Sequence, residues 1–152
     1  MCLSLLGTFH GGHESEKWHP KKSSIWQVLV SLQALILVEA PMYNEPGHDG
    51  LRGTPEGARS SAAYDRALRL QTVRHAMLEP LRRAAASGGG PRAGAFGEVV
   101  RAHFAWHREG LRRQLVTWLA EAASGEDEEL AGRMAADAAE MCAELDKLAV
   151  MS

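Results

Sequence analysis

Apolar residues recur with a helical period along most of this chain. The first such segment covers residues 25–38, where apolar positions three and four apart follow Ser23 and Ser24, two residues that can cap a helix. Its β-branched residues would also suit a strand. Its length and its interspersed polar residues favour a helix.

Three more segments show the same period. The first starts at Ser60 or Ser61 and is expected to kink or end at Pro80. The other two span residues 96–122 and 126–149. The positions available for a core are Tyr64, Leu68, Leu70, Met77, Leu78, Leu81, Phe96, Val100, Phe104, His107, Leu111, Leu115, Trp118, Leu130, Met134, Met141, Leu145 and Leu148.

Only one short segment has the pattern of a strand. Residues 2–6 nearly alternate between apolar and polar side chains. Residues 39–57 hold three prolines and four glycines, which predicts a long loop without regular structure, and long loops are commonly functional. Residues 87–95 are glycine-rich and are expected to form a linker. The chain as given is therefore predicted to be predominantly helical.

Composition narrows the class of protein. The 152 residues are 45% hydrophobic and 24% charged, in the ordinary range for a globular domain. A net charge of -2 gives no general attraction to nucleic acid or to an anionic membrane. No apolar run is long enough to span the roughly 30 Å of a bilayer core, and the first nine residues lack the features of a signal peptide. Two cysteines cannot form a disulfide framework. We expect a soluble protein of the cytoplasm or nucleus, without membrane or nucleic-acid partners.

Charge is unevenly distributed along the chain. Residues 126–152 carry eight acidic and two basic residues, a net charge of -6. Residues 1–125 carry eleven acidic and fifteen basic residues, a net charge of +4. The acidic segment could dock on the arginine-rich remainder, or it could be a solvated helix, which is the commoner case.

One histidine pair has the spacing of metal ligands. His103 and His107 lie four residues apart, but Phe104 stands where a zinc protease needs glutamate, and no third ligand is close in sequence. The pattern favours a half-buried helix face over a metal site. The glycine run 88–90 lacks the flanking residues of a phosphate-binding loop. We therefore predict no metal and no cofactor.

Cys2 stands at the head of several motifs in a fixed order. Cys-Leu-Ser-Leu-Leu-Gly-Thr at 2–8 is followed by Trp-His-Pro at 18–20 and by the Ser-Ser-led apolar segment 23–38. In this order the motifs resemble the stretch that begins at the catalytic cysteine of ubiquitin-conjugating enzymes, above all the large hybrid conjugating-enzyme and ligase kind. The likeness covers residues 2 to about 82 and, more weakly, 96–118.

The resemblance implies an α+β fold of which this chain holds mainly the C-terminal helical half. In that family a helix, a four-stranded sheet and a His-Pro-Asn turn precede the catalytic cysteine, whereas one methionine precedes Cys2 here. The implied organisation follows the order of the segments along the chain. It comprises the C-terminal part of a ubiquitin-conjugating core domain at 1–86, a linker at 87–95, a helix of the family's C-terminal extension at 96–123 and an acidic amphipathic helix at 126–150.

The resemblance also implies a reaction. Cys2 would receive ubiquitin from the ubiquitin-activating enzyme as a thioester and pass it to a lysine of a protein substrate, directly or with a ubiquitin ligase. Asn44 and Glu45 would border the active site and help the lysine lose its proton. The Trp18–Pro20 segment would contact ligases, although Trp18 could equally fill the domain core. The helix at 25–38 would pack beneath the cysteine.

Three hypotheses are consistent with the sequence. The leading one is a ubiquitin-conjugating transferase that is incomplete in this chain, through a truncated or internally initiated reading frame, and has little activity alone. The alternative is a non-catalytic helical module of the ubiquitin pathway. In that case the apolar faces at 25–38 and 61–84, which lack a sheet to cover them, would bind a partner or a second copy. The third is an unrelated helical bundle.

Overall fold

The structure is a computed structural model that describes residues 4–7, 17–45, 47–86 and 96–150. All regular elements within these ranges are helical, which confirms the predominantly helical prediction. The predicted strand at 2–6 is wrong for its described residues, because Ser4–Leu6 form the 3₁₀ turn η1. A short strand without a neighbouring strand has no ladder of hydrogen bonds to hold it extended. None of the described helices is both long and apolar enough to cross a membrane.

The chain divides into two compact units, Met1–Asp65 and Arg66–Ser152. The boundary falls inside helix α2, which spans Pro55–Gln71. Each unit is described below by itself.

In the first unit, α1 spans Ile25–Ser31 and continues as the π-helical segment η3, Leu32–Ile36. The predicted cap is confirmed at Ser24, whose hydroxyl accepts from the Gln27 amide at 3.4 Å while the Gln27 side chain accepts from the Ser24 amide at 2.8 Å. Several large apolar side chains of this helix are exposed, including Trp26 at 72%. Within the described part of this unit, α1 therefore has little to pack against.

The loop predicted at 39–57 is more regular than expected. It forms two 3₁₀ turns, η4 at Pro41–Asn44 and η5 at Asp49–Leu51, and it buries Met42. Helix α2 starts at Pro55 rather than at Ser60 or Ser61, because the Thr54 hydroxyl accepts from the Gly57 amide at 3.0 Å and proline is well suited to the first helical position. Only glycine fits at position 57, since a Cβ there would collide with the Leu51 carbonyl.

The second unit continues from α2 through the π-helical segment η6, Thr72–Leu78, into α3, Glu79–Ala86. The helix therefore does not end at Pro80. Proline lacks an amide hydrogen and crowds the carbonyl four residues earlier. The wider π turn accommodates it, because the preceding Glu79 amide bonds to the Arg74 carbonyl, five residues back.

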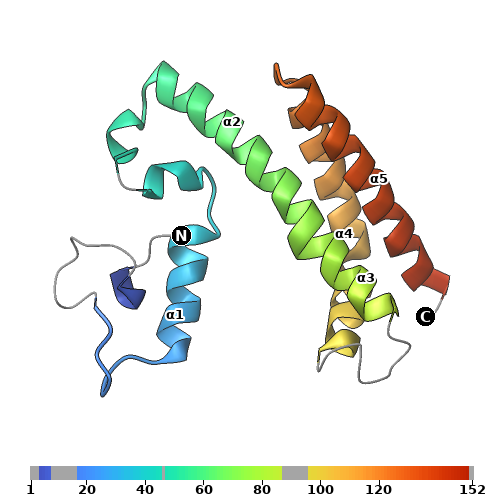
Figure 1. The fold of residues 1–152 in the computed structure, drawn as a ribbon, viewed down its shortest axis with the longest axis horizontal. Helices are drawn as coiled ribbons and strands as arrows, with labels where there is room; N and C mark the ends of the chain where they lie inside the picture. Colours follow the sequence, from blue (N-terminus) through green and yellow to red (C-terminus); the bar gives the residue numbers. More distant parts are fainter. Residues whose placement is uncertain (1–3, 8–16, 46, 87–95, 151–152) are drawn as a thin grey trace. The chain divides into compact units, whose positions relative to one another are not determined.

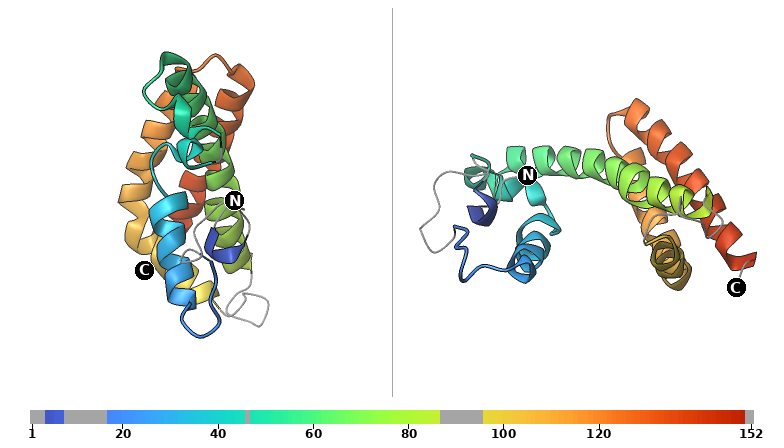
Figure 2. Two further views of the ribbon diagram at one scale, coloured as in Figure 1. Left: turned by 90° about the vertical axis from the view of Figure 1, so that its left-hand side faces the viewer. Right: turned by 60° about the horizontal axis from the view of Figure 1, so that its bottom comes forward.

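Helices α4, Gly97–Ala123, and α5, Glu128–Val150, lie side by side with η6 and α3 packed against them (Figures 1 and 2). Helix α5 starts at Glu128 because the Asp127 carboxylate accepts from the Leu130 amide at 2.8 Å. The core contains Leu70, Val73, Met77, Leu78, Leu81, Phe104, Leu115, Ala122, Met134, Ala138, Met141, Leu145 and Leu148.

This packing corrects several predictions. The apolar face expected to lie bare at 61–84 is covered by α4 and α5 from Leu70 onward, so it needs no sheet. Leu68 and Phe96 are exposed by 39% and 72%, so neither belongs to the core. The core also contains Val73, which the sequence pattern did not single out.

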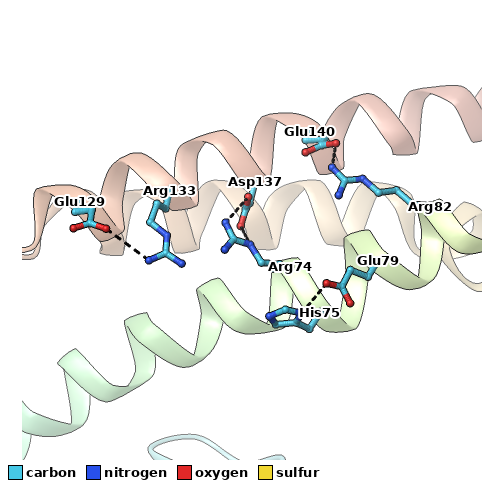
Figure 3. A network of polar contacts seen from close by, with 8 residues as sticks. All are labelled: Arg74, His75, Glu79, Arg82, Glu129, Arg133, Asp137 and Glu140. Carbon is cyan, nitrogen blue, oxygen red and sulfur yellow. Dashed lines mark hydrogen bonds and ion pairs between the residues drawn. The ribbon is translucent and has the colours of Figure 1, made fainter.

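The acidic helix docks on arginines of the same unit, which is the rarer of the two outcomes considered for it. Arg74 donates two hydrogen bonds to the Asp137 carboxylate (Figure 3), at 3.0 and 3.2 Å. Asp137 is 9% exposed. Arg82 pairs with Glu140, and Arg112 pairs with Asp146 further along α5. The opposite net charges of the two segments are thus matched by contacts between helices.

Candidate functional site

Cys2 lies outside the described residues, so the geometry of the predicted site rests on Asn44 and Glu45. These two residues end the turn η4 in the first unit. Both are exposed, and each side chain is held by a partner from a different helical element.

Asn44 fastens the turn to the end of the first helix. Its side-chain amide nitrogen donates to the Leu35 carbonyl at 2.9 Å, within η3. Carbonyls in the last turn of a helix lack a partner further along the helix. The Asn44 amide therefore acts as a side-chain cap for this end of η3.

Glu45 is held from the other side by α2. The Tyr64 hydroxyl donates to the Glu45 carboxylate, with 2.6 Å between the two oxygens. This hydrogen bond, with smaller contributions from burial and from the Glu45 charge, raises the pKa of Tyr64 to about 12. Glu45 is therefore a carboxylate fixed in one orientation, and Tyr64, which the sequence pattern assigned to the core, is its anchor.

The segment that carries Asn44 and Glu45 starts from a strained backbone. Ala40 has a φ of 49°, in the left-handed region that residues with a side chain rarely adopt, and it directly precedes Pro41. Arg52, which follows η5, lies over the ring of Tyr43 in η4, 4.7 Å from its centroid, and so links the two turns. Strain of this kind persists only where surrounding contacts hold it, and it is common at functional sites.

The Tyr64 pKa gives a direct test of this arrangement. Replacing Glu45 by glutamine is expected to lower the pKa of Tyr64 from about 12 toward the ordinary value of 10.0, because the carboxylate no longer favours the protonated phenol. The ultraviolet absorbance of tyrosinate measures it, in a Tyr43→Phe background that leaves Tyr64 as the single tyrosine. An unchanged titration in Glu45→Gln would mean that the two side chains do not meet.

The same contact predicts how the stability of the fold changes with pH. A pKa of Tyr64 raised in the folded state stabilises the fold below about pH 10, and this contribution is lost as the pH rises to about 12. Over that interval the Glu45→Gln variant is expected to lose less stability than the natural sequence.

The structure decides two other interpretations. Trp18 is 42% exposed, so it does not fill the core of the first unit in this chain. The turn after it is held by His19, whose carbonyl accepts from the Lys22 and Ser23 amides at 2.9 and 2.8 Å. His103 and His107 are exposed rather than half-buried. Among the described residues, no group of three or more His, Cys, Asp or Glu side chains could hold a metal ion.

The chain is similar to curated proteins over most of its length. It is 44% identical over 133 residues, 88% of this chain, to the dual E2 ubiquitin-conjugating enzyme/E3 ubiquitin-protein ligase BIRC6 of Mus musculus. It is 34% identical over 122 residues, 80% of this chain, to the "Probable ubiquitin-conjugating enzyme E2 R521" of Acanthamoeba polyphaga mimivirus. It is 37% identical over 119 residues, 78% of this chain, to the "Probable ubiquitin-conjugating enzyme protein 17" of Caenorhabditis elegans.

These matches confirm the resemblance drawn from the motifs, including the hybrid conjugating-enzyme and ligase kind. No family model matches the sequence. The matched segments amount to 2%, 8% and 15% of the three relatives, so the chain corresponds to a small part of each.

Proposed function

We propose that this chain, a relative of the ubiquitin-conjugating enzymes, carries the part of a ubiquitin-conjugating domain that begins at the catalytic cysteine, with Cys2 as the thioester nucleophile. The observation that carries the proposal is 44% identity over 88% of the chain to a protein named as a dual conjugating enzyme and ligase. The activating enzyme would supply ubiquitin, and a protein lysine would receive it.

The proposed reaction has two steps. In the first, the Cys2 thiolate attacks the thioester carbonyl of ubiquitin on the activating enzyme, whose own thiolate leaves. In the second, a lysine amine attacks the Cys2 thioester, an amide bond forms, and the Cys2 thiolate leaves. The amine loses a proton in this step, and a carboxylate such as Glu45 could accept it.

The exposed helix of the first unit supports the proposal that the family's sheet is missing from this chain. Ile25 and Trp26, in the first turn of α1, are 68% and 72% exposed, and Leu37, which directly follows η3, is 76% exposed. Apolar area of this kind normally packs against another layer of secondary structure. In the proposed α+β fold, that layer is the family's four-stranded sheet.

A charging assay tests the proposal. The chain is incubated with ubiquitin-activating enzyme, ATP and ubiquitin, alone and fused behind the sheet-containing part of the mouse relative's conjugating domain. We expect a thiol-sensitive ubiquitin adduct on the fused chain and at least about tenfold less on the chain alone, because the oxyanion formed in transfer needs positioned donors. No adduct on a folded fused chain would overturn the proposal.

A non-catalytic interaction module is the second candidate, and the same exposed face of α1 favours it. The fused chain separates the two functions. An interaction module would bind ubiquitin-pathway proteins without acquiring a thiol-sensitive adduct, whereas a conjugating domain would become charged.

A further inference from the structure

The turn η4 ends in an exposed glutamate whose backbone is held on both sides. The Glu45 amide donates to the Met42 carbonyl at 3.1 Å, and the Glu45 carbonyl accepts from the His48 amide at 3.2 Å. Met42 is only 3% exposed, so the residue that accepts the first of these bonds is itself buried. The backbone of Glu45 therefore has a defined position, although its side chain is exposed.

The carboxylate of Glu45 is held as well. An exposed glutamate ordinarily samples several side-chain conformations, and restricting it to one has an entropic cost. The Tyr64 hydroxyl, 19 residues further along the chain, donates to Glu45 Oε1 over 2.6 Å, a length typical of a hydrogen bond to a charged oxygen. Tyr64 is half-buried on α2, and its side chain has only two torsions, so it is a firm support. Three contacts thus restrain one surface glutamate.

Tyr64 is suited to the role of a permanent donor. The hydrogen bond to Glu45 raises the pKa of Tyr64 to about 12, so the phenol stays protonated at neutral pH. A carboxylate can accept hydrogen bonds at about four lone-pair sites on its two oxygens, and one phenol hydroxyl occupies one of them. Glu45 therefore keeps the capacity to accept a proton from an approaching cation.

The second step of the proposed reaction needs such an acceptor. The ordinary pKa of a lysine side chain is about 10.4, so at neutral pH the substrate arrives as an ammonium without a lone pair. Proton transfer requires the base to lie about 2.6–3.2 Å from the nitrogen. A carboxylate that moves among several conformations meets this condition only part of the time. A carboxylate held in one orientation meets it whenever lysine binds.

We propose that Tyr64 is a positioning residue for the transfer of ubiquitin to lysine, and that it holds the Glu45 carboxylate in the orientation that takes a proton from the incoming ammonium. The inference rests on the proposed function, with Cys2 as the thioester nucleophile. One ammonium proton passes to Glu45, the freed nitrogen bonds to the thioester carbonyl carbon, the C–S bond breaks and Cys2 leaves as a thiolate. The new amide nitrogen releases its second proton to water. Tyr64 keeps its own proton throughout.

A single-turnover discharge assay tests the inference. The fused chain is charged with ubiquitin, ATP is removed, and loss of the thioester is followed after addition of free lysine. We expect Tyr64→Phe to charge within about twofold of the natural sequence and to discharge to lysine about tenfold more slowly. Hydroxylamine is largely uncharged at neutral pH, so its attack needs no base to free a lone pair, and discharge to it should change by less than about twofold.

Two further variants separate positioning from a purely structural role. Glu45→Gln lacks the proton acceptor, so it should slow discharge to lysine at least as much as Tyr64→Phe does. Adding Tyr64→Phe to Glu45→Gln should slow it no further, because no carboxylate remains to be oriented. Tyr43→Phe is the matched control, since it removes the other tyrosine hydroxyl of the chain and keeps the ring that contacts Arg52. It should discharge to lysine at the natural rate.

The outcomes distinguish this inference from the proposed function. If the fused natural sequence forms no thioester, the proposed function and this inference are both wrong. If it forms the thioester, discharge of Tyr64→Phe to lysine at the natural rate would overturn the inference alone. The inference is also wrong if Tyr64→Phe fails to charge, or if its discharge to lysine and to hydroxylamine slows equally, because either result marks a structural role.

Discussion

Replacing Arg74 by methionine is expected to lower the free energy of unfolding of the Arg66–Ser152 unit by about 3 kcal/mol. Arg74 holds the Asp137 carboxylate with two hydrogen bonds (Figure 3). The Asp137 side chain is 12% exposed. Methionine keeps the apolar stem but leaves a carboxylate among core residues without its cation. Urea unfolding followed by far-ultraviolet circular dichroism measures the loss.

Two variants on the same helices make this result specific. Arg133→Met removes the ion pair to Glu129, in which the two charged groups are 3.8 Å apart. The Arg133 and Glu129 side chains are 44% and 85% exposed, so this variant should lower the free energy of unfolding by less than about 1 kcal/mol. The double variant Arg74→Met/Asp137→Leu removes both charges and should recover most of the stability that Arg74→Met loses. If Arg74→Met lowers the free energy of unfolding by no more than Arg133→Met does, the ion pair between Arg74 and Asp137 does not stabilise the unit as described.

Replacing Cys2 by alanine is expected to abolish the thiol-sensitive ubiquitin adduct on the fused chain. Alanine has no nucleophile, and a neighbouring hydroxyl or amine does not form a bond that thiols cleave. Because the whole adduct depends on one sulfur atom, the expected effect is complete loss rather than slower charging. Gel electrophoresis with and without reductant gives the measurement.

Cys142→Ala is the matched control, since these two are the only cysteines in the chain. Cys142 lies on α5, partly buried against the core of the second unit. Its replacement should leave charging unchanged. If the adduct persists in Cys2→Ala and is absent in Cys142→Ala, the thioester forms on Cys142 and the assignment to Cys2 is wrong.

Local signals in the sequence were sufficient for most of the helices. The cap at Ser24 and the apolar period of α4 are properties of neighbouring residues, and both were predicted correctly. The predicted start of α2 at Ser60 or Ser61 is too late. The glycines and prolines at 39–57 indicate a loop, but Thr54 followed by Pro55 is itself a start signal.

Contacts between distant residues could not be predicted in the same way. The pairing of Arg74 with Asp137 joins residues that are 63 positions apart in the sequence. A difference in net charge between two segments does not indicate which arginine pairs with which acid. The hydrogen bond from Tyr64 to Glu45 is not predictable from the apolar period. That pattern indicates where a tyrosine ring lies but gives no partner for its hydroxyl. Passage of the helix through Pro80 depends on the π turn before it.

A protection experiment on the two thiols tests directly whether Cys2 carries the ubiquitin thioester. The fused chain is charged with ubiquitin, its free thiols are alkylated, the adduct is released with hydroxylamine, and peptides are analysed by mass spectrometry. We expect Cys142 to be alkylated and Cys2 to be unmodified in the charged chain. An alkylated Cys2 in chains that carry the hydroxylamine-sensitive adduct would contradict it.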